Sequence, residues 1–187
     1  MTAYDLPTSL KIGEVAYSIR TGWRTVMDIF SALNDPELDE EMRTETMLRI
    51  LYVDYIKIPP QHMQEAVEKA CEFLDCGIKP DKTNRPRTMD WEQDAALIIP
   101  EINNVSGCEV RMNPDIHWWT FFGWYMSIGS GLFASVLSIR RKKQKGQKLE
   151  KYEEEFYREN RHLIEMKRAD SKEILEEKEN ILKWLNS

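Results

Sequence analysis

The residue types that most often carry chemistry are scattered along this chain. His62, His117 and His162 lie far apart in the sequence, and four residues separate Cys71 from Cys76. A zinc site needs several histidine or cysteine ligands clustered at short spacing. The sequence therefore predicts no metal site, and we expect no bound cofactor.

Three acidic residues, Asp90, Glu92 and Asp94, lie close enough in sequence to suggest paired carboxylates for general acid–base catalysis. The same residues fall in the expected first turn of a helix, where the helix dipole favours negative charge. Asp90 and Gln93 also have the spacing of a capping box. We interpret the three acids as structural, and we expect no catalytic residue here.

A glycine-rich stretch at 129–134, Gly-Ser-Gly-Leu-Phe-Ala, matches the pattern of a dinucleotide-binding loop. That loop works only after a β-strand, because the strand aims the following helix N-terminus at the pyrophosphate. Here a helical pattern precedes it, so we expect a corner between two helices. No Walker loop, nucleophile elbow or His-Glu-x-x-His motif occurs elsewhere, and we predict that the protein is not an enzyme.

Aromatic and basic residues are the candidates for binding. The partner-binding candidates are Trp118, Trp119, Phe122, Tyr125, Arg140, Arg141, Lys142, Lys143, Tyr152 and Phe156. The basic run Arg140–Lys148 could bind nucleic acid, but the aromatic residues precede the run and do not alternate with it. We favour a solvated helix end or a contact with an acidic protein surface, and we keep a nucleic-acid-binding regulator as the alternative.

The 23 residues from His117 to Ile139 carry no formally charged side chain and precede a basic run, as a membrane-spanning helix would. Gly129, Ser130 and Gly131 interrupt this segment near its middle, and three tryptophans crowd at one end. A membrane protein that spans this segment is therefore the less favoured alternative to two helices of a soluble core.

Composition sets the class of protein and its compartment. The 187 residues include 42% hydrophobic and 31% charged residues, a globular balance, with a formal net charge of −6. This charge disfavours a protein that mainly coats nucleic acid. The odd number of cysteines, three, suggests reducing conditions, and the sequence starts without a basic region followed by an apolar run. We therefore expect a cytoplasmic protein.

Hydrophobic periodicity predicts a mainly α-helical fold with a short N-terminal β-hairpin. Residues 9–19 alternate around Gly13-Glu14, which indicates two strands packed on helices, a strand-addition edge being the less favoured alternative. Helical spacing follows in segments that we expect to start at Trp23, Asp39, Pro60, Asp90, Asn113 and Leu132. We expect Met42 to face the core, Gly77 and Gly107 to cap helices, and residues 79–88 to form an exposed loop that Trp91 holds to the body.

The sequence divides into a compact helical core domain, residues 1–145, and a long, charged C-terminal helical arm, residues 146–187. Apolar residues recur at alternating spacings of three and four in the arm, with a break at Glu159; the later ones lie around Ile174, Lys178, Ile181 and Leu185. The arm could fold back on the core or bind a partner.

Five segments together resemble a family of small proteins from phages of Gram-positive bacteria, encoded near the tape measure gene. The segments are Leu6–Leu10, Phe30–Pro36, Met89–Asp94, His117–Phe121 and Glu155–Asn160. The resemblance implies a tail-assembly chaperone that keeps the helical tape measure protein soluble, helps to recruit tail-tube subunits and leaves before the virion is complete. It implies a location in the host cytoplasm, and the family has no catalytic residues to carry over.

Overall fold

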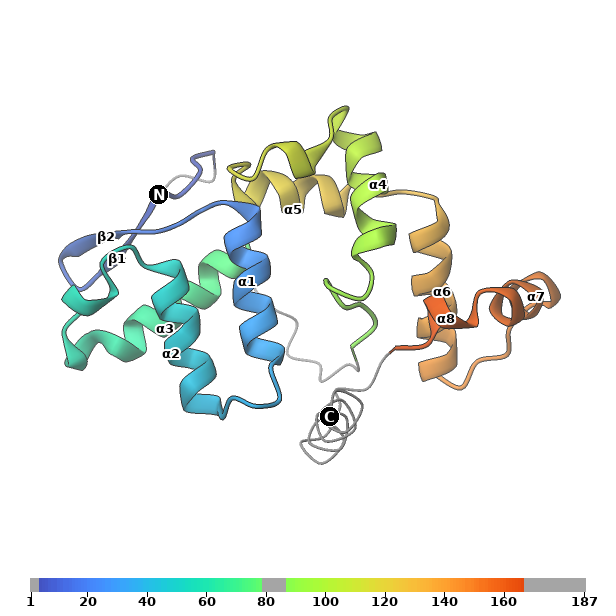
Figure 1. Cartoon of the computed structure of the whole chain (residues 1–187), viewed down its shortest axis with the longest axis horizontal. Helices are drawn as coiled ribbons and strands as arrows, with labels where there is room; N and C mark the ends of the chain where they lie inside the picture. The colour runs from blue at the N-terminus through green and yellow to red at the C-terminus, as the bar shows by residue number, and fades with distance from the viewer. Residues whose placement is uncertain (1–3, 79–86, 167–187) are drawn as a thin grey trace, which may run out of the picture.

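A computed structural model describes residues 4–78 and 87–166 of the chain. Its elements form an elongated, mainly α-helical arrangement (Figure 1). The segment up to residue 78 occupies one end, residues 95–126 lie in the middle, and residues 132–166 form the other end (Figure 1). The predicted helical class and the N-terminal hairpin are confirmed.

The hairpin consists of β1 (Ser9–Ile12) and β2 (Val15–Ser18), paired antiparallel with Leu10 opposite Tyr17. Leu10, Ile12 and Tyr17 are buried. The turn residue Gly13 donates its backbone N–H to the Glu65 carboxylate on α3 (Met63–Leu74) at 2.9 Å. The hairpin therefore packs on helices, as the alternation predicts.

The first three helices are α1 (Trp23–Asn34), α2 (Glu40–Leu51) and α3, with short 3-10 turns at Tyr55–Lys57 and Pro60–His62 between the last two. Asp39 caps α2, since its carboxylate accepts the Met42 N–H at 2.8 Å. Met42 was expected in the core, but it is exposed. Met47, which lies on a different face of α2, is buried instead.

The connector between β2 and α1 is hydrogen-bonded through its backbone to the end of α2 and to the start of α5. The Arg20 N–H donates to the Leu51 carbonyl oxygen at 2.8 Å, and Thr21 accepts from the Trp118 N–H at 2.7 Å. At Gly22 the connector approaches the segment before α5 so closely that a Cβ atom on this residue would lie 2.9 Å from the Pro114 carbonyl oxygen. A side chain at this position would therefore push the connector away from the segment before α5.

The middle of the molecule contains α4 (Ala95–Ser106), a 3-10 turn (Val110–Met112) and α5 (Trp118–Met126). Gly107 ends α4 with a φ of 70°, which confirms its predicted role as a cap. The Asp90 carboxylate accepts the Gln93 N–H at 2.7 Å, as expected for the first residue of a capping box, but it caps a turn at 91–94, and α4 begins only at Ala95. The predicted helix start at Asn113 is wrong, because Asn113 ends the 3-10 turn and α5 begins only after His117.

The last helices are α6 (Leu132–Gln144), α7 (Lys151–Glu159) and α8 (Arg161–Ile164). Gly129–Gly131 form the expected corner between α5 and α6. The helical pattern breaks at Asn160, and α8 turns back so that Ile164 packs with Val136 and Ile139 of α6. The expected arm is therefore folded back on α6 up to residue 166.

Other predictions concern residues that lie outside the described ones. These are the arm positions around Ile174, Lys178, Ile181 and Leu185, and residues 79–86 of the expected loop.

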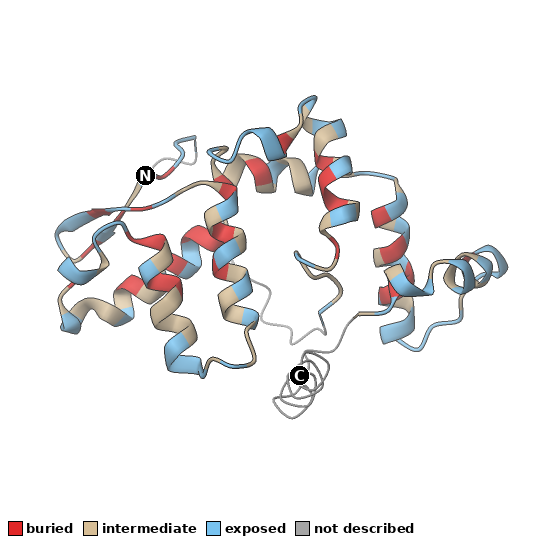
Figure 2. Cartoon of the chain, viewed as in Figure 1, coloured by how far each residue is buried: buried red, intermediate tan, exposed pale blue. Residues whose placement is uncertain are grey.

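Buried residues form one large cluster in the hairpin and α1–α5, which Phe133 of α6 joins, and a small cluster between α6 and α8 (Figure 2). Leu97 of α4 packs against both clusters. Over residues 4–78 and 87–166, no helix has the length and apolar character needed to cross a membrane.

Candidate interaction site

His117, one of the residues that could carry chemistry, has a structural role. The His117 Nδ1 atom accepts the Trp119 N–H at 3.1 Å, and its Nε2 atom lies 3.0 Å from the Pro7 carbonyl oxygen, so the ring caps α5. Burial raises the pKa of the Cys76 thiol to about 12, which keeps it protonated at neutral pH. Within the described part of the chain, no group of three or more His, Cys, Asp or Glu residues could hold a metal ion.

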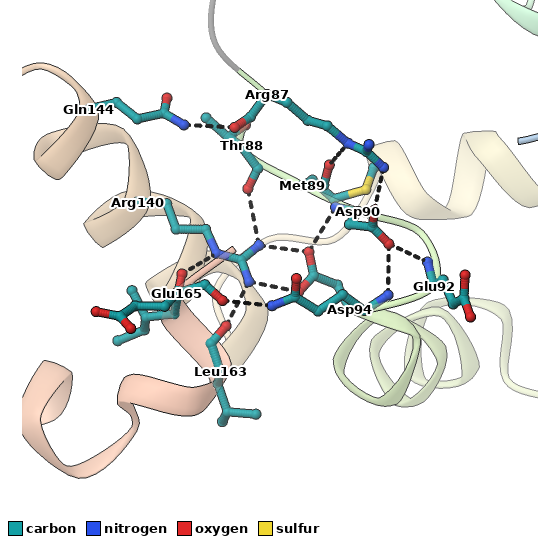
Figure 3. A network of polar contacts seen from close by, with 12 residues as sticks. Arg87, Thr88, Met89, Asp90, Glu92, Asp94, Arg140, Gln144, Leu163 and Glu165 are labelled. Carbon is teal, nitrogen blue, oxygen red and sulfur yellow. Dashed lines mark hydrogen bonds and ion pairs between the residues drawn. The ribbon is translucent and has the colours of Figure 1, made fainter. Parts of the chain in front are cut away.

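One of the three acids at 90–94 has a role that differs from the predicted one. Asp94 is almost fully buried and forms a two-pronged ion pair with Arg140 of α6, with N–O distances of 2.7 and 2.8 Å (Figure 3). Asp94 Oδ2 also accepts the Asp90 N–H at 3.0 Å. The carboxylate therefore binds a buried cation 46 residues away rather than only complementing the dipole of α4.

Arg140 uses every donor of its guanidinium group. Besides the Asp94 carboxylate, it donates to the carbonyl oxygens of Thr88, Leu163 and Ile164 at 3.1, 2.6 and 2.7 Å (Figure 3). Five N–H groups on a rigid plane can satisfy several acceptors at once, which makes arginine suited to a buried site. Arg140 thus joins α6 to α8 and to the segment before α4.

Residues 87–93 extend this network to further elements. The Arg87 guanidinium pairs with Asp90 and donates to the Asn34 side chain at the end of α1, while Gln144 of α6 donates to the Arg87 carbonyl oxygen. Gln93 donates to the Glu165 carbonyl oxygen at 2.8 Å. The segment therefore connects α1, α6 and the residues that follow α8.

The structure distributes the basic run over several environments. Lys142 donates to both Glu153 carboxylate oxygens at 2.7 Å, and Lys143 lies 3.6 Å from the centre of the Tyr157 ring. The hydrogen bond between Lys142 and Glu153 raises the pKa of Lys142 and lowers the pKa of Glu153. Together with buried Arg140, these contacts reduce the basic surface that a nucleic acid could use. The exposed Arg141 is one part that stays accessible.

The predicted aromatic residues lie mainly inside the fold. Trp118 is buried, and the indoles of Trp118 and Trp119 donate to the carbonyl oxygens of Leu74 and Phe73, both at 2.9 Å. They tie α5 to the end of α3. Phe122 and Tyr125 are half-buried beside them, and burial raises the pKa of Tyr125.

Two further candidates lie on α7. Tyr152 is 70% exposed, whereas Phe156 is half-buried against the small cluster of α6 and α8. The structure therefore does not gather the ten candidates on one surface. Arg141 and Tyr152 offer exposed side chains, while Trp118 and Arg140 are packed within the chain.

The structure has an apolar cleft on a surface that the sequence did not indicate. An apolar cleft of about 440 Å³ lies between α1 on one side and Asp90–Ile99 on the other. From α1 it is lined by Trp23, Met27, Phe30 and Asn34, which recur at spacings of four, three and four along one helix face. This spacing gives the cleft an elongated wall as long as α1 itself.

The other wall and the floor of the cleft are aromatic and aliphatic. Trp91 stacks on Phe30 with ring centroids 6.1 Å apart, and Phe121 stacks on Trp23 at 4.6 Å. Ile98 and Ile99 complete the apolar lining. A cleft of this kind suits the aliphatic or aromatic side chains of a partner.

Charged residues border the cleft. Arg24 and Arg111 lie along its rim, where Arg24 donates to the Arg111 carbonyl oxygen at 2.7 Å. Asp28 and Glu92 are exposed acids on the same rim. The combination of an apolar floor and a charged rim is common in protein interfaces.

Sequence reasoning missed this cleft. Its walls come from two helix faces that were each interpreted as core, and periodicity alone does not show where two such faces fail to close. The segment Met89–Asp94 gave a partial signal, because it contains both Trp91 of the cleft and Asp94 of the buried ion pair.

Comparison with known proteins identifies one family. A family model described as Bacteriophage Gp15 protein matches residues 3–166, which includes every described residue. No curated protein and no solved structure matches the chain.

Proposed function

The chain belongs to the Bacteriophage Gp15 protein family, and on this premise we propose that it is a non-catalytic tail-assembly chaperone. In this proposal it binds the tape measure protein, tail-tube subunits, or both, during tail morphogenesis. The partners follow from the resemblance described above. The cleft between α1 and Asp90–Ile99 is the observation that supports a binding role.

The shape of the cleft favours a helical partner. An amphipathic helix presents apolar side chains at spacings of three and four, which is also the spacing of Trp23, Met27 and Phe30 along the wall. A long helical tape measure protein has such a stripe to cover before the tail tube surrounds it. Insertion of a few apolar side chains into the cleft would shield the stripe reversibly.

The location proposed for this activity is the cytoplasm of the bacterial host. A chaperone of this kind acts while the tail is assembled, and we propose that it is absent from the mature virion. Analysis of purified virions by mass spectrometry, with the tape measure protein as internal standard, tests this part directly. Stoichiometric amounts of the chain in virions would contradict it.

The binding proposal is tested by co-expression with the tape measure protein of the same phage. The expected result is a complex that co-purifies and an increase in soluble tape measure protein. Ser31→Arg places a long cation at the edge of the cleft on an exposed position of α1, and it should abolish both effects.

Ser138→Arg is the matched control, because Ser138 is an exposed serine within α6, away from the cleft lining. It should leave complex formation unchanged. Loss of binding in both variants, or in neither, would argue against the cleft. Folded wild-type protein that binds neither tape measure nor tail-tube protein would refute the proposed function.

A further inference from the structure

The cleft between α1 and Asp90–Ile99 has a candidate occupant within the same chain. Residues 167–187 contain apolar residues spaced so that one helix face would carry Ile174, Ile181 and Leu185, with Lys178 among them. We propose that this segment docks in the cleft as an amphipathic helix and competes there with a partner. The competition rests on the proposed function, whereas the docking does not.

The spacing of the two surfaces matches. Positions 174, 178, 181 and 185 are separated by four, three and four residues, as are Trp23, Met27, Phe30 and Asn34 on the α1 wall. Twelve residues of helix, the span from 174 to 185, extend about 18 Å at 1.5 Å per residue, and α1 has the same twelve residues. A helix of residues 174–185 could therefore follow the wall along its whole length.

The chain leaves the described structure beside the cleft. The Glu165 carbonyl oxygen accepts a hydrogen bond from Gln93 at 2.8 Å, and the neighbouring Glu92 lines the cleft. Eight residues lead from Met166 to Ile174, and they can span at most about 29 Å when extended. The connection can therefore be longer than α1, which extends about 18 Å, and it starts beside the Glu92 side of the cleft.

Two acids on the rim can accommodate the one charged residue of the predicted stripe, Lys178. Lys178 falls within the apolar stripe, where a wholly apolar cleft would disfavour it. Besides Arg24 and Arg111, the rim carries the exposed acids Asp28 and Glu92, and a lysine can extend its charged end to one of these acids while its methylene groups remain over apolar surface. The cleft thus offers a place for both the apolar residues and the lysine.

Photo-crosslinking in the full chain tests the docking. Benzoylphenylalanine replaces Ser31 at the edge of the cleft or, as the control position, Glu68, an exposed residue of α3 outside the cleft lining. Irradiation at Ser31 should link peptides of residues 167–187 within a single chain, at a yield independent of protein concentration. Irradiation at Glu68 should give no such product.

Variants of residues 167–187 test whether the crosslink depends on the apolar face of this segment or only on its nearness to the cleft. The double variant Ile181→Glu/Leu185→Glu should lower the crosslink yield roughly tenfold or more, because two apolar side chains lose their burial. The matched variant Asn180→Glu/Asn186→Glu adds the same charge beside the stripe and should change the yield little. Product at the mass of two chains, no product with residues 167–187, or equal loss in both variants would overturn the proposal.

Competition between residues 167–187 and the tape measure protein is tested by measuring the affinity of the tape measure complex. If both proposals hold, Ile181→Glu/Leu185→Glu should bind the tape measure protein more tightly than wild type, whereas Asn180→Glu/Asn186→Glu should not. An intact crosslink without tape measure binding contradicts only the proposed function. Tape measure binding that is sensitive to Ser31→Arg, without the crosslink, contradicts only the docking.

Discussion

The hairpin with α1–α5 and the unit α6–α8 are stabilised in different ways. In the first region, aromatic rings such as Trp118, Phe121 and Phe30 pack in one extended core. In the second, Val136, Ile139 and Ile164 form a small buried apolar cluster. Phe133 of α6 reaches into the large core, and the polar network of Arg140 also holds the unit to the rest of the molecule (Figure 3).

The difference matters because the two kinds of interaction respond differently to change. Apolar packing is non-directional, so its loss is spread over many neighbours. A buried ion pair depends on each of its hydrogen bonds, and removal of one partner leaves an uncompensated charge. We therefore expect a single polar substitution to loosen α6–α8 more than the aromatic core, although Phe133 still anchors α6 in that core.

Trp118→Ala should have the largest effect on stability. It removes a fully buried indole and its hydrogen bond to the Leu74 carbonyl oxygen, and should lower the free energy of unfolding by roughly 3–5 kcal/mol. Urea denaturation followed by circular dichroism measures this loss. If only α6–α8 lost protection in hydrogen exchange, the assignment of Trp118 to the shared core would be contradicted.

Asp94→Asn should have the next largest effect, about 3 kcal/mol, because it leaves Arg140 buried without its carboxylate. Hydrogen exchange should accelerate in α6 and α8 before it changes in α1–α3. Asp94→Leu combined with Arg140→Met removes both charges and should recover part of the stability. Equal acceleration in both regions would show that the network does not hold α6–α8 separately.

Glu153→Gln should have the smallest effect, and that effect should depend on pH. The hydrogen bond from Lys142, assisted by the Glu150 N–H, lowers the pKa of Glu153 from 4.5. A lowered pKa stabilises the fold above the ordinary value, and this contribution disappears as pH falls through the lowered value. The stability difference between wild type and variant should therefore be present at pH 7 and shrink below about pH 4.5.

The exposed Glu155 on the same helix provides the control for this prediction. Denaturation of Glu155→Gln at the same pH values should show a smaller difference from wild type at pH 7. A Glu153→Gln difference that grows as the solution is acidified would contradict the role of the Lys142 contact.

Local patterns in the sequence predicted most elements of the fold. Alternation around Gly13-Glu14 indicated the hairpin, and the cap residues Asp39 and Gly107 marked helix ends, because these signals act over a few residues. The Asn113-Pro114 signal failed because it resembles a helix start, whereas Asn113 closes the preceding 3-10 turn. Sequence patterns over a few residues do not distinguish the start of a helix from the end of a 3-10 turn.

The candidate site depended on contacts between distant segments. The basic run suggested an exposed cationic surface, yet Arg140 is buried because Asp94, 46 residues earlier, provides its counter-charge. Likewise, the cleft exists because the faces of α1 and Asp90–Ile99 meet without closing. Spacing within one helix contains no information about either contact.

The bonds of Arg140 also set an order for folding during synthesis. The ribosome produces Asp94 long before Arg140, and the acceptor carbonyls of Leu163 and Ile164 come later still. Domains generally acquire structure from the N-terminus as the chain emerges. The nascent chain can thus assemble its hairpin and first three helices while the Asp94 carboxylate is still hydrated, and the attachment of α6–α8 is completed only once residue 164 has left the ribosome.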